Sequence, residues 1–372
     1  MTTRPRLCWL SLSLVVALVL LIGCQAEPTP TVVVGEPTRA AKPTFTPAPS
    51  ETPAPTVTPS PTLVPTPTPD PNVNPLTGLP VSDPELLRRR VLAVRVGNDP
   101  IIRPQDGLGA AEIVYEELME GYSLTRFTAI YLAGQAERVR PIRSARLSSL
   151  AIAPQFNAVL VHSGASDQIR WFISQSKEFT DLDQYFHDEP YAILPGYDWR
   201  GRMYTSVERV HEYLLGLGQE SDEPVAGYLF DAEPPDGDSA TAVTIPYPQV
   251  CKADWQYDVA TGVYLRSVAG EPHIDGVTGE QLSAANVVVL YVAHNKTDIV
   301  EDSLGSTAID IVLSGEGEAS LFRDGQMVPC TWRRPADGGL VQYYDNKGGL
   351  VPLKPGQTWV ELVPPDYEVV HH

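Results

Sequence analysis

The distribution of proline divides this chain more sharply than any other pattern. Residues 28–71 hold 14 Pro and 11 Thr, in Thr-Pro pairs that recur without a strict period. Proline fixes φ and removes a backbone donor, so this segment cannot form a helix or the centre of a sheet. A polyproline-type chain rises about 3.1 Å per residue, so this segment reaches at most roughly 140 Å. We expect residues 24–72 to be a disordered, semi-extended stalk; a ligand segment for proline-binding domains is the alternative.

The segment before the stalk is typical of an export signal. Arg4 and Arg6 precede an uncharged and mainly apolar stretch, Leu7 to Ile22, which is short for a membrane span and suits a signal-peptide core. The stretch ends in Leu-Ile-Gly-Cys24, which resembles a bacterial lipobox. We therefore predict a signal peptide over residues 1–23, lipidation of Cys24 and an extracytoplasmic protein held at the membrane by acyl chains. An uncleaved anchor helix is the alternative.

Charge and cysteine content limit the partners. The formal net charge is −19, and residues 1–72 carry as many basic as acidic side chains, so the excess lies in residues 73–372. Such a body repels an anionic polymer, and we expect no nucleic acid partner. After Cys8 and Cys24, the folded body keeps Cys251 and Cys330, for which both a disulfide and two separate thiols stay open. No cysteine spacing fits zinc, and we predict no metal or cofactor.

The folded body reads as two units of an α+β protein. The first, residues 73–235, is expected to be a layered α/β domain, and the second, residues 240–366, a smaller and mostly antiparallel β domain. Strand-like runs in the first unit are Val91–Val96, Ile113–Met119, Thr125–Leu132 and Ala158–Val161. Apolar residues spaced as on one helix face predict helices around 169–176 and 207–214, the second with Ser206 as its N-cap. Strand-like runs in the second unit are Ala242–Tyr247, Trp255–Tyr257, Gly262–Val268, Val287–Val292, Thr307–Leu313 and Trp359–Val363.

Charged and polar residues gather in the first unit. On a strand, Glu116 and Glu117 point to opposite faces, so one of them must face an apolar side and needs a cation. Arg126, Arg143 and Arg146 are the partners we expect. The ligand-binding candidates are Arg103, Glu116, Glu117, Arg126, Arg143, Ser144, Arg146, His162, Ser166 and Tyr204.

Three interpretations of this set stay open. It is a structural ion-pair network, an arginine-lined pocket for an anion, or a catalytic site with Glu as acid or base. His162 ends an apolar strand, where ligands often bind in layered α/β sheets, but a lone histidine there is also a common structural residue. The catalytic residues are unknown at this point, because no nucleophile elbow, phosphate loop or dinucleotide fingerprint is found.

Several motifs resemble the YerB-type bacterial lipoprotein family over essentially all of residues 74–365. They are Asn74-Pro-Leu-Thr-Gly78, Arg103-Pro-Gln-Asp-Gly-Leu108, Glu112-Ile-Val-Tyr-Glu116, Thr125-Arg-Phe127, Arg140-Pro-Ile-Arg-Ser-Ala-Arg146, His273-Ile-Asp275 and Pro355-Gly-Gln-Thr-Trp359. The resemblance implies a two-domain, lipid-anchored surface protein and carries over no catalytic residues. The chain departs from the family pattern with Gly164-Ala165-Ser166 after the strand-end histidine, and with Arg200-Gly201-Arg202 before Met203-Tyr204. Both departures favour binding over catalysis.

Three hypotheses follow for the function. The first is binding of an anionic envelope component or small anionic ligand through an arginine-lined cleft beside His162. The second is an envelope hydrolase acting on glycosidic or phosphodiester bonds, with a carboxylate near His162 or Tyr204. The third is a protein-interaction scaffold without a pocket, in which the arginines are buried in ion pairs.

Overall fold

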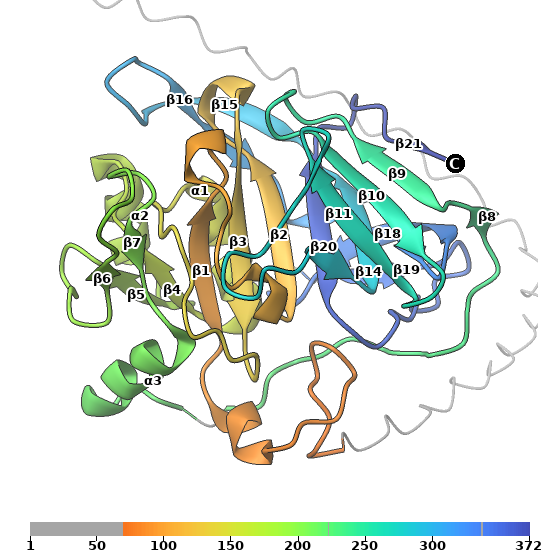
Figure 1. The fold of residues 1–372 in the computed structure, drawn as a ribbon, viewed down its shortest axis with the longest axis horizontal. Coiled ribbons are helices and arrows are strands. Elements are labelled where there is room, and N and C mark those ends of the chain that lie inside the picture. Colours follow the sequence, from red (N-terminus) through yellow and green to blue (C-terminus); the bar gives the residue numbers. More distant parts are fainter. Residues whose placement is uncertain (1–69, 222, 336–337) are drawn as a thin grey trace, which may run out of the picture. The chain divides into compact units, whose positions relative to one another are not determined.

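Strands from both halves of the sequence pair in one eleven-stranded sheet (Figure 1). The computed structural model describes residues 70–221, 223–335 and 338–372, so the predicted signal peptide, Cys24 and nearly all of the stalk lie outside the described residues. The halves meet where β2 and β20 run parallel, with Ile113 beside Thr358. The sheet order is β19 (Gln342–Tyr344), β18 (Gln326–Arg334), β17 (Gly315–Arg323), β14 (Asn286–Tyr291), β20 (Thr358–Val363), β2 (Ile113–Leu118), β3 (Thr125–Tyr131), β1 (Leu92–Gly97), β4 (Val159–His162) and β5 (Thr180–Asp183), with β8 (Asp238–Ser239) beside β18.

A second sheet is built from the C-terminal half of the chain. Its order is β12 (Glu271–Pro272), β11 (Val263–Val268), β10 (Ala253–Asp258), β9 (Ala242–Ile245) and β21 (Val370–His371), with β13 (Ser283–Ala284) beside β11. Two small ribbons complete the strands: the hairpin of β15 (His294–Val300) and β16 (Thr307–Ile311), and the pair β6 (Ala192–Ile193) and β7 (Met203–Tyr204).

Helices are short and few in the part of the chain that the structure describes. The α-helices are α1 (Leu147–Ile152), α2 (Asp167–Gln175) and α3 (Val207–Gly216). Ser206 caps α3 by accepting a hydrogen bond from the backbone N–H of Arg209, as the sequence predicts. Short 3-10 turns are η1 (Pro84–Arg88), η2 (Pro100–Ile102), η3 (Leu108–Ala110), η4 (Glu120–Tyr122) and η5 (Ala153–Phe156).

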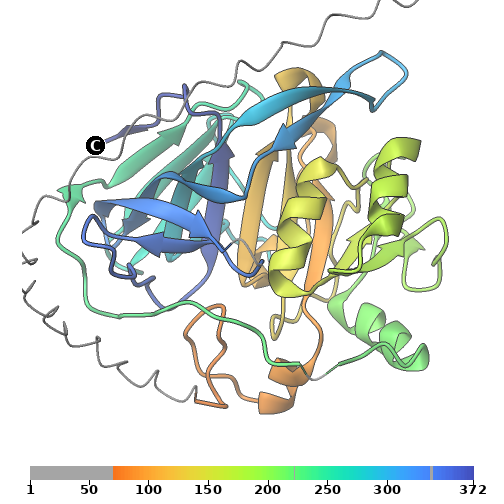
Figure 2. The ribbon, with the colours of Figure 1, turned by 180° about the vertical axis from the view of Figure 1, so that it is seen from behind.

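The two faces of the main sheet carry different layers. Tyr115 on one face packs edge-on against Phe156 of η5, and the same face lies under α1 and the β15–β16 hairpin, which Figure 2 views from in front. Trp359 on the other face packs against Trp255 of the second sheet. A strand that is covered on both faces is buried at every residue and not only at alternate residues. Every residue of β1, β2, β3 and β20 is buried, so these strands are covered on both faces.

The fold is α+β with far more strand than helix, which confirms the predicted class at that level. The predicted strands of the first unit appear as β1 to β4, and the predicted helices as α2 and α3. No strand was predicted over β15, β17 or β18. The domain boundary expected at 235–240 stays a prediction, because the two halves share a sheet. Within the described residues, no helix is both long and apolar enough to cross a membrane.

Candidate functional site

Arg126 lies at the edge of the sheet where three parallel strands end. β1 pairs parallel to β4, and β4 to β5, so Gly97, His162 and Asp183 finish at one edge. β3 runs antiparallel to β1 and begins at this same edge, which places Arg126 directly opposite Gly97. In open sheets with parallel strands, this edge is where ligands commonly bind.

Gly97 makes room above this end of the sheet. A Cβ atom at position 97 would lie 2.8 Å from Cγ of Arg143 and 2.7 Å from Cδ1 of Ile102, closer than side chains approach one another. Because Gly97 has no side chain, the side chain of Arg143 can lie over the end of β1, next to Arg126. The backbone holds it there, since the N–H of Arg143 donates to the carbonyl of Arg95 and its carbonyl accepts from Ser163.

Four guanidinium groups gather at this place, those of Arg95, Arg126, Arg143 and Arg146, and we call them the arginine cluster. Arg126 is 7% exposed and donates one hydrogen bond, from Nη1 to the carbonyl of Ser144 at 2.8 Å. No carboxylate of the described residues lies within ion-pair distance of it. Burial, followed by the charges of Arg146, Arg143 and Arg95, holds the pKa of Arg126 well below its usual value.

The other members of the cluster each have a carboxylate. Arg146 binds Glu120 through two hydrogen bonds, of 2.8 Å from Nε and 2.6 Å from Nη2. Burial alone would raise the pKa of Glu120, but the hydrogen bonds and charge of Arg146 outweigh it and lower the pKa to about 2. Arg143 is held loosely, 3.6 Å from Asp99, and its buried Nε has no hydrogen-bond partner. Arg95 forms an ion pair with Glu117 beneath them.

Glu301 reaches the cluster from the tip of the β15–β16 hairpin, residues 301–306. Its side chain has no exposed surface and lies 3.5 Å from Nε of Arg146. Neither carboxylate oxygen has a hydrogen-bond partner of normal geometry, and the buried hydroxyl of Ser166, the N-cap residue of α2, has none either. Burial raises the pKa of Glu301, while the charges of Arg146 and Arg126 and the nearby Ser166 hydroxyl act against that shift.

The two adjacent glutamates of β2 require a correction. Both are fully buried, and neither is paired with Arg126, Arg143 or Arg146 as the sequence suggested. Glu117 pairs with Arg95 and accepts a 2.6 Å hydrogen bond from Thr128. Glu116, on the opposite face, pairs with Arg266 from the second sheet. The continuous burial of β2 explains the error, because a strand covered on both faces needs a cation on each.

Arg266 is the centre of a separate buried network. Its guanidinium lies 4.8 Å from the ring centre of Trp359 and donates to His273 and to Glu116. Glu361 of β20 is beside Glu116 in register and accepts a 2.9 Å hydrogen bond from the Trp255 indole. Burial and the charge of Glu116 raise the pKa of Glu361 to about 8. Neither of the two hollows described below includes any of these residues, so we assign this network to the packing of the two sheets.

The remaining predicted residues contribute no side chain to the arginine cluster. Arg103 ties the two halves together by donating to the carbonyls of Asn98 and Val250. His162 is buried, with Nδ1 2.8 Å from the Gly164 carbonyl and Nε2 2.7 Å from Asp181, which is a structural arrangement. Tyr204 packs beside Arg209, 6.0 Å from its guanidinium carbon. Ser144 contributes its carbonyl to the site, not its hydroxyl.

Cys251 and Cys330 are separate free thiols, so the structure contains the second of the two arrangements that the sequence left open. Burial raises the pKa of Cys330 to about 12. Among the described residues, no cluster of three or more His, Cys, Asp and Glu side chains could hold a metal ion.

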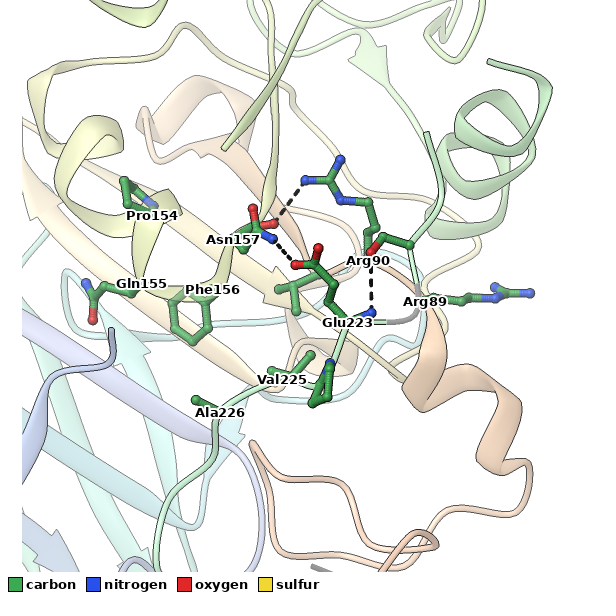
Figure 3. A pocket seen from close by; sticks show the side chains of 12 residues that line it. Arg89, Arg90, Pro154, Gln155, Phe156, Asn157, Glu223, Val225 and Ala226 are labelled. Carbon is green, nitrogen blue, oxygen red and sulfur yellow. Dashed lines mark hydrogen bonds between the residues drawn. The ribbon is translucent and has the colours of Figure 1, made fainter. Parts of the chain in front are cut away.

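Two hollows lie away from the arginine cluster, and neither includes Arg126, Arg143 or Arg146. One, of about 170 Å³, lies near the starts of β1 and β4, where Asn157 bridges Arg90 and Glu223 (Figure 3). The other, of about 590 Å³, lies between η1 and α3, where Arg89 pairs with Glu208 at 2.7 Å. Arg90 at the first hollow donates to the Thr180 hydroxyl and to the carbonyls of Gln219 and Asn157, and it is less buried than Arg126.

Comparisons with known proteins identify the family. Two family models, described as the N-terminal and C-terminal domains of "Protein of unknown function (DUF3048)", match residues 76–218 and 243–360. The protein named "Putative lipoprotein YerB" of Bacillus subtilis (strain 168) is 29% identical over 303 residues, which make up 78% of this chain and 86% of the relative. This chain belongs to the YerB-like family.

The solved structure of YerB from Bacillus subtilis confirms the relationship in three dimensions. It matches with a TM-score of 0.69 at 27% identity, covering 80% of this chain and 99% of the solved one. The resemblance indicated by the sequence motifs is therefore confirmed. Sequence reasoning did not select Glu301 or Arg95 of this YerB-like chain. Arg95 stands in an otherwise apolar strand run, which is a usable signal for a buried cation, whereas Glu301 has no such signal in its polar hairpin.

Proposed function

We propose that this YerB-like protein is anchored to the membrane through lipidated Cys24 and binds a small oxyanion, carboxylate or phosphate, at the arginine cluster. The stalk then serves to hold the folded body, and with it the site, away from the lipid surface. An envelope polymer that carries such groups would be recognised through them. The one observation that carries the proposal is the state of Arg126, a buried guanidinium without a carboxylate partner.

A buried charge without a counter-charge costs several kcal/mol of folding free energy, and native proteins rarely keep one without cause. An oxyanion bound between Arg126 and Arg143 would give Arg126 a carboxylate or phosphate in direct contact and would supply an acceptor for the buried Nε of Arg143. Guanidinium groups bind planar carboxylates and phosphates through paired hydrogen bonds, which makes both chemically suitable ligands.

A thermal-shift experiment tests the proposal on the full-length chain in detergent. Malonate and inorganic phosphate are titrated against the wild type and against Arg126→Met. A ligand present at 100 times its Kd stabilises the folded state by about 2.7 kcal/mol. We expect a saturable increase in the unfolding temperature of the wild type and none in the variant.

Arg333→Met is the matched control, because Arg333 is an exposed arginine of β18 that pairs with Glu316. This control should respond to the anions as the wild type does. Circular dichroism checks that every variant is folded. Equal responses from Arg126→Met and Arg333→Met would assign the effect to general salt stabilisation and refute the proposal. Detection of unmodified Cys24 by mass spectrometry would refute the anchor.

A further inference from the structure

We propose that Glu301 is an internal carboxylate that occupies the ligand site, so that the hairpin tip must leave before a carboxylate-bearing ligand enters. This inference rests on the proposed function and specifies both the ligand class and the regulation of the site. Glu301 belongs to a segment that is remote in sequence from the arginine cluster, yet its side chain lies beside the cluster.

The contacts of Glu301 are those of an occupant rather than of a structural ion pair. Its side chain is fully enclosed, yet its closest cation, Nε of Arg146, is 3.5 Å away and already donates to Glu120 at 2.8 Å. The fully buried ion pair of Arg140 with Asp106 is closer, at 2.7 Å. The carboxylate of Glu301 therefore lies near cations, although neither of its oxygens accepts a hydrogen bond of normal geometry.

Glu301 lies at the tip of a hairpin whose β16 strand is anchored in the core by the buried side chains of Ile309 and Ile311. β15 and β16 pair only with each other, so the hairpin belongs to neither large sheet. The hairpin tip is closed by its own turn, in which Glu301 donates to the Ser306 carbonyl and Asp302 accepts from the N–H of Ser306. Leu304 at its end is 90% exposed. Figure 2 shows the hairpin extending past the sheet on the side of α1 and α2.

The charge count supports an exchange of one carboxylate for another. The four guanidinium groups of the arginine cluster face four carboxylates, which are Asp99, Glu117, Glu120 and Glu301. Removal of Glu301 leaves one uncompensated positive charge beside Arg126. A ligand carboxylate that replaces Glu301 leaves the net buried charge of the cluster unchanged. The ligand and Glu301 can therefore compete for the site with similar electrostatic free energies.

The experiment compares Glu301→Gln, Glu301→Asp and Asp310→Asn with the wild type, in full-length protein, using malonate as the probe and phosphate as the second arm. A site that is free in only one tenth of the molecules binds ten times more weakly, so removing the occupant should tighten the malonate Kd about tenfold. Glu301→Asp keeps the charge but shortens the side chain by one methylene, so it should also tighten binding. Asp310→Asn removes an equal charge from an exposed position of β16 and should leave the Kd unchanged.

Each outcome decides the inference. Tighter malonate binding in both Glu301 variants and not in Asp310→Asn supports it. Tightening in Glu301→Gln with no change in Glu301→Asp would show a charge effect without displacement and overturn it, as would equal tightening in Asp310→Asn. Tighter binding of phosphate than of malonate by Glu301→Gln would overturn the carboxylate assignment. Arg126-dependent binding by the wild type with no effect of Glu301→Gln would reject this inference alone, whereas no binding by any variant would reject the proposed function with it.

Discussion

Replacing Arg126 by methionine should leave the ligand-free protein at least as stable as the wild type. Two terms oppose each other in this change. The hydrogen bond from the guanidinium to the Ser144 carbonyl is lost, which costs about 1.5–3 kcal/mol for a charged donor. Removing a buried ion in favour of an apolar side chain of similar size gains about 1–4 kcal/mol. Relief of repulsion from Arg143 and Arg146 adds to the gain, so we expect a net change between about zero and 2 kcal/mol of stabilisation.

Arg140→Met is the comparison variant for the expected change in the free energy of unfolding. Arg140 is also buried, but its guanidinium donates to Asp106 and to the carbonyls of Gly201 and Pro104. Breaking a buried ion pair costs about 3–5 kcal/mol, because the abandoned carboxylate stays buried. The two variants should therefore differ by at least about 3 kcal/mol, or roughly 5 °C in unfolding temperature measured by circular dichroism without added anions. Equal losses in the two variants would refute the reasoning and identify Arg126 as an ordinary structural cation.

Three further outcomes are expected. Burial raises the folded-state pKa of Glu361 to about 8, above its ordinary value of 4.5, so its contribution to stability is complete below pH 4.5 and is lost as the pH rises towards 8. The wild type should therefore lose stability on the order of 3 kcal/mol between pH 5 and 8 in urea unfolding, and Glu361→Gln should not show this loss. An unchanged pH profile in the variant would contradict this. Arg266→Met should destabilise the protein by about 3–5 kcal/mol at pH 7, because it strands Glu116 between the sheets; a smaller loss in the same assay would mean that the network is dispensable. Since Cys330 has a pKa of about 12 and Cys251 is buried, neither thiol should react with iodoacetamide at pH 8 within minutes unless the protein is denatured, and dithiothreitol should not lower the unfolding temperature.

Local sequence patterns predicted a helix or strand correctly where the residues of that segment alone determine its structure. They did not predict features that depend on a partner far away in the sequence. The strand runs at 113–118 and 125–131, and the capped helix at 207–216, follow from residue type and spacing alone. The parallel pairing of β2 with β20 joins residues separated by about 245 positions, and no turn motif records such a pairing. The shared sheet was therefore out of reach, although both strands were predicted.

The same limit explains the outcome for the site. The sequence selected Arg126, Arg143 and Arg146, which do lie together, because they flank strand ends close in the chain. It assigned them to the wrong carboxylates, because the cations for Glu116 and Glu117 come from β11 and β1. Glu301 could not be found, because its position depends on how a hairpin from the second half of the chain crosses the first.

The way this protein treats its other buried arginines bears on the meaning of Arg126. Arg95, Arg140 and Arg266 are each fully buried, and each is matched with a carboxylate at contact distance. Carboxylates are also available near Arg126, since Glu117 stands opposite it in register on β2 and yet pairs with Arg95. A fold with this supply of acidic side chains could pair Arg126 as readily as the rest. The missing partner is therefore the observation on which our proposal of an exchangeable oxyanion rests.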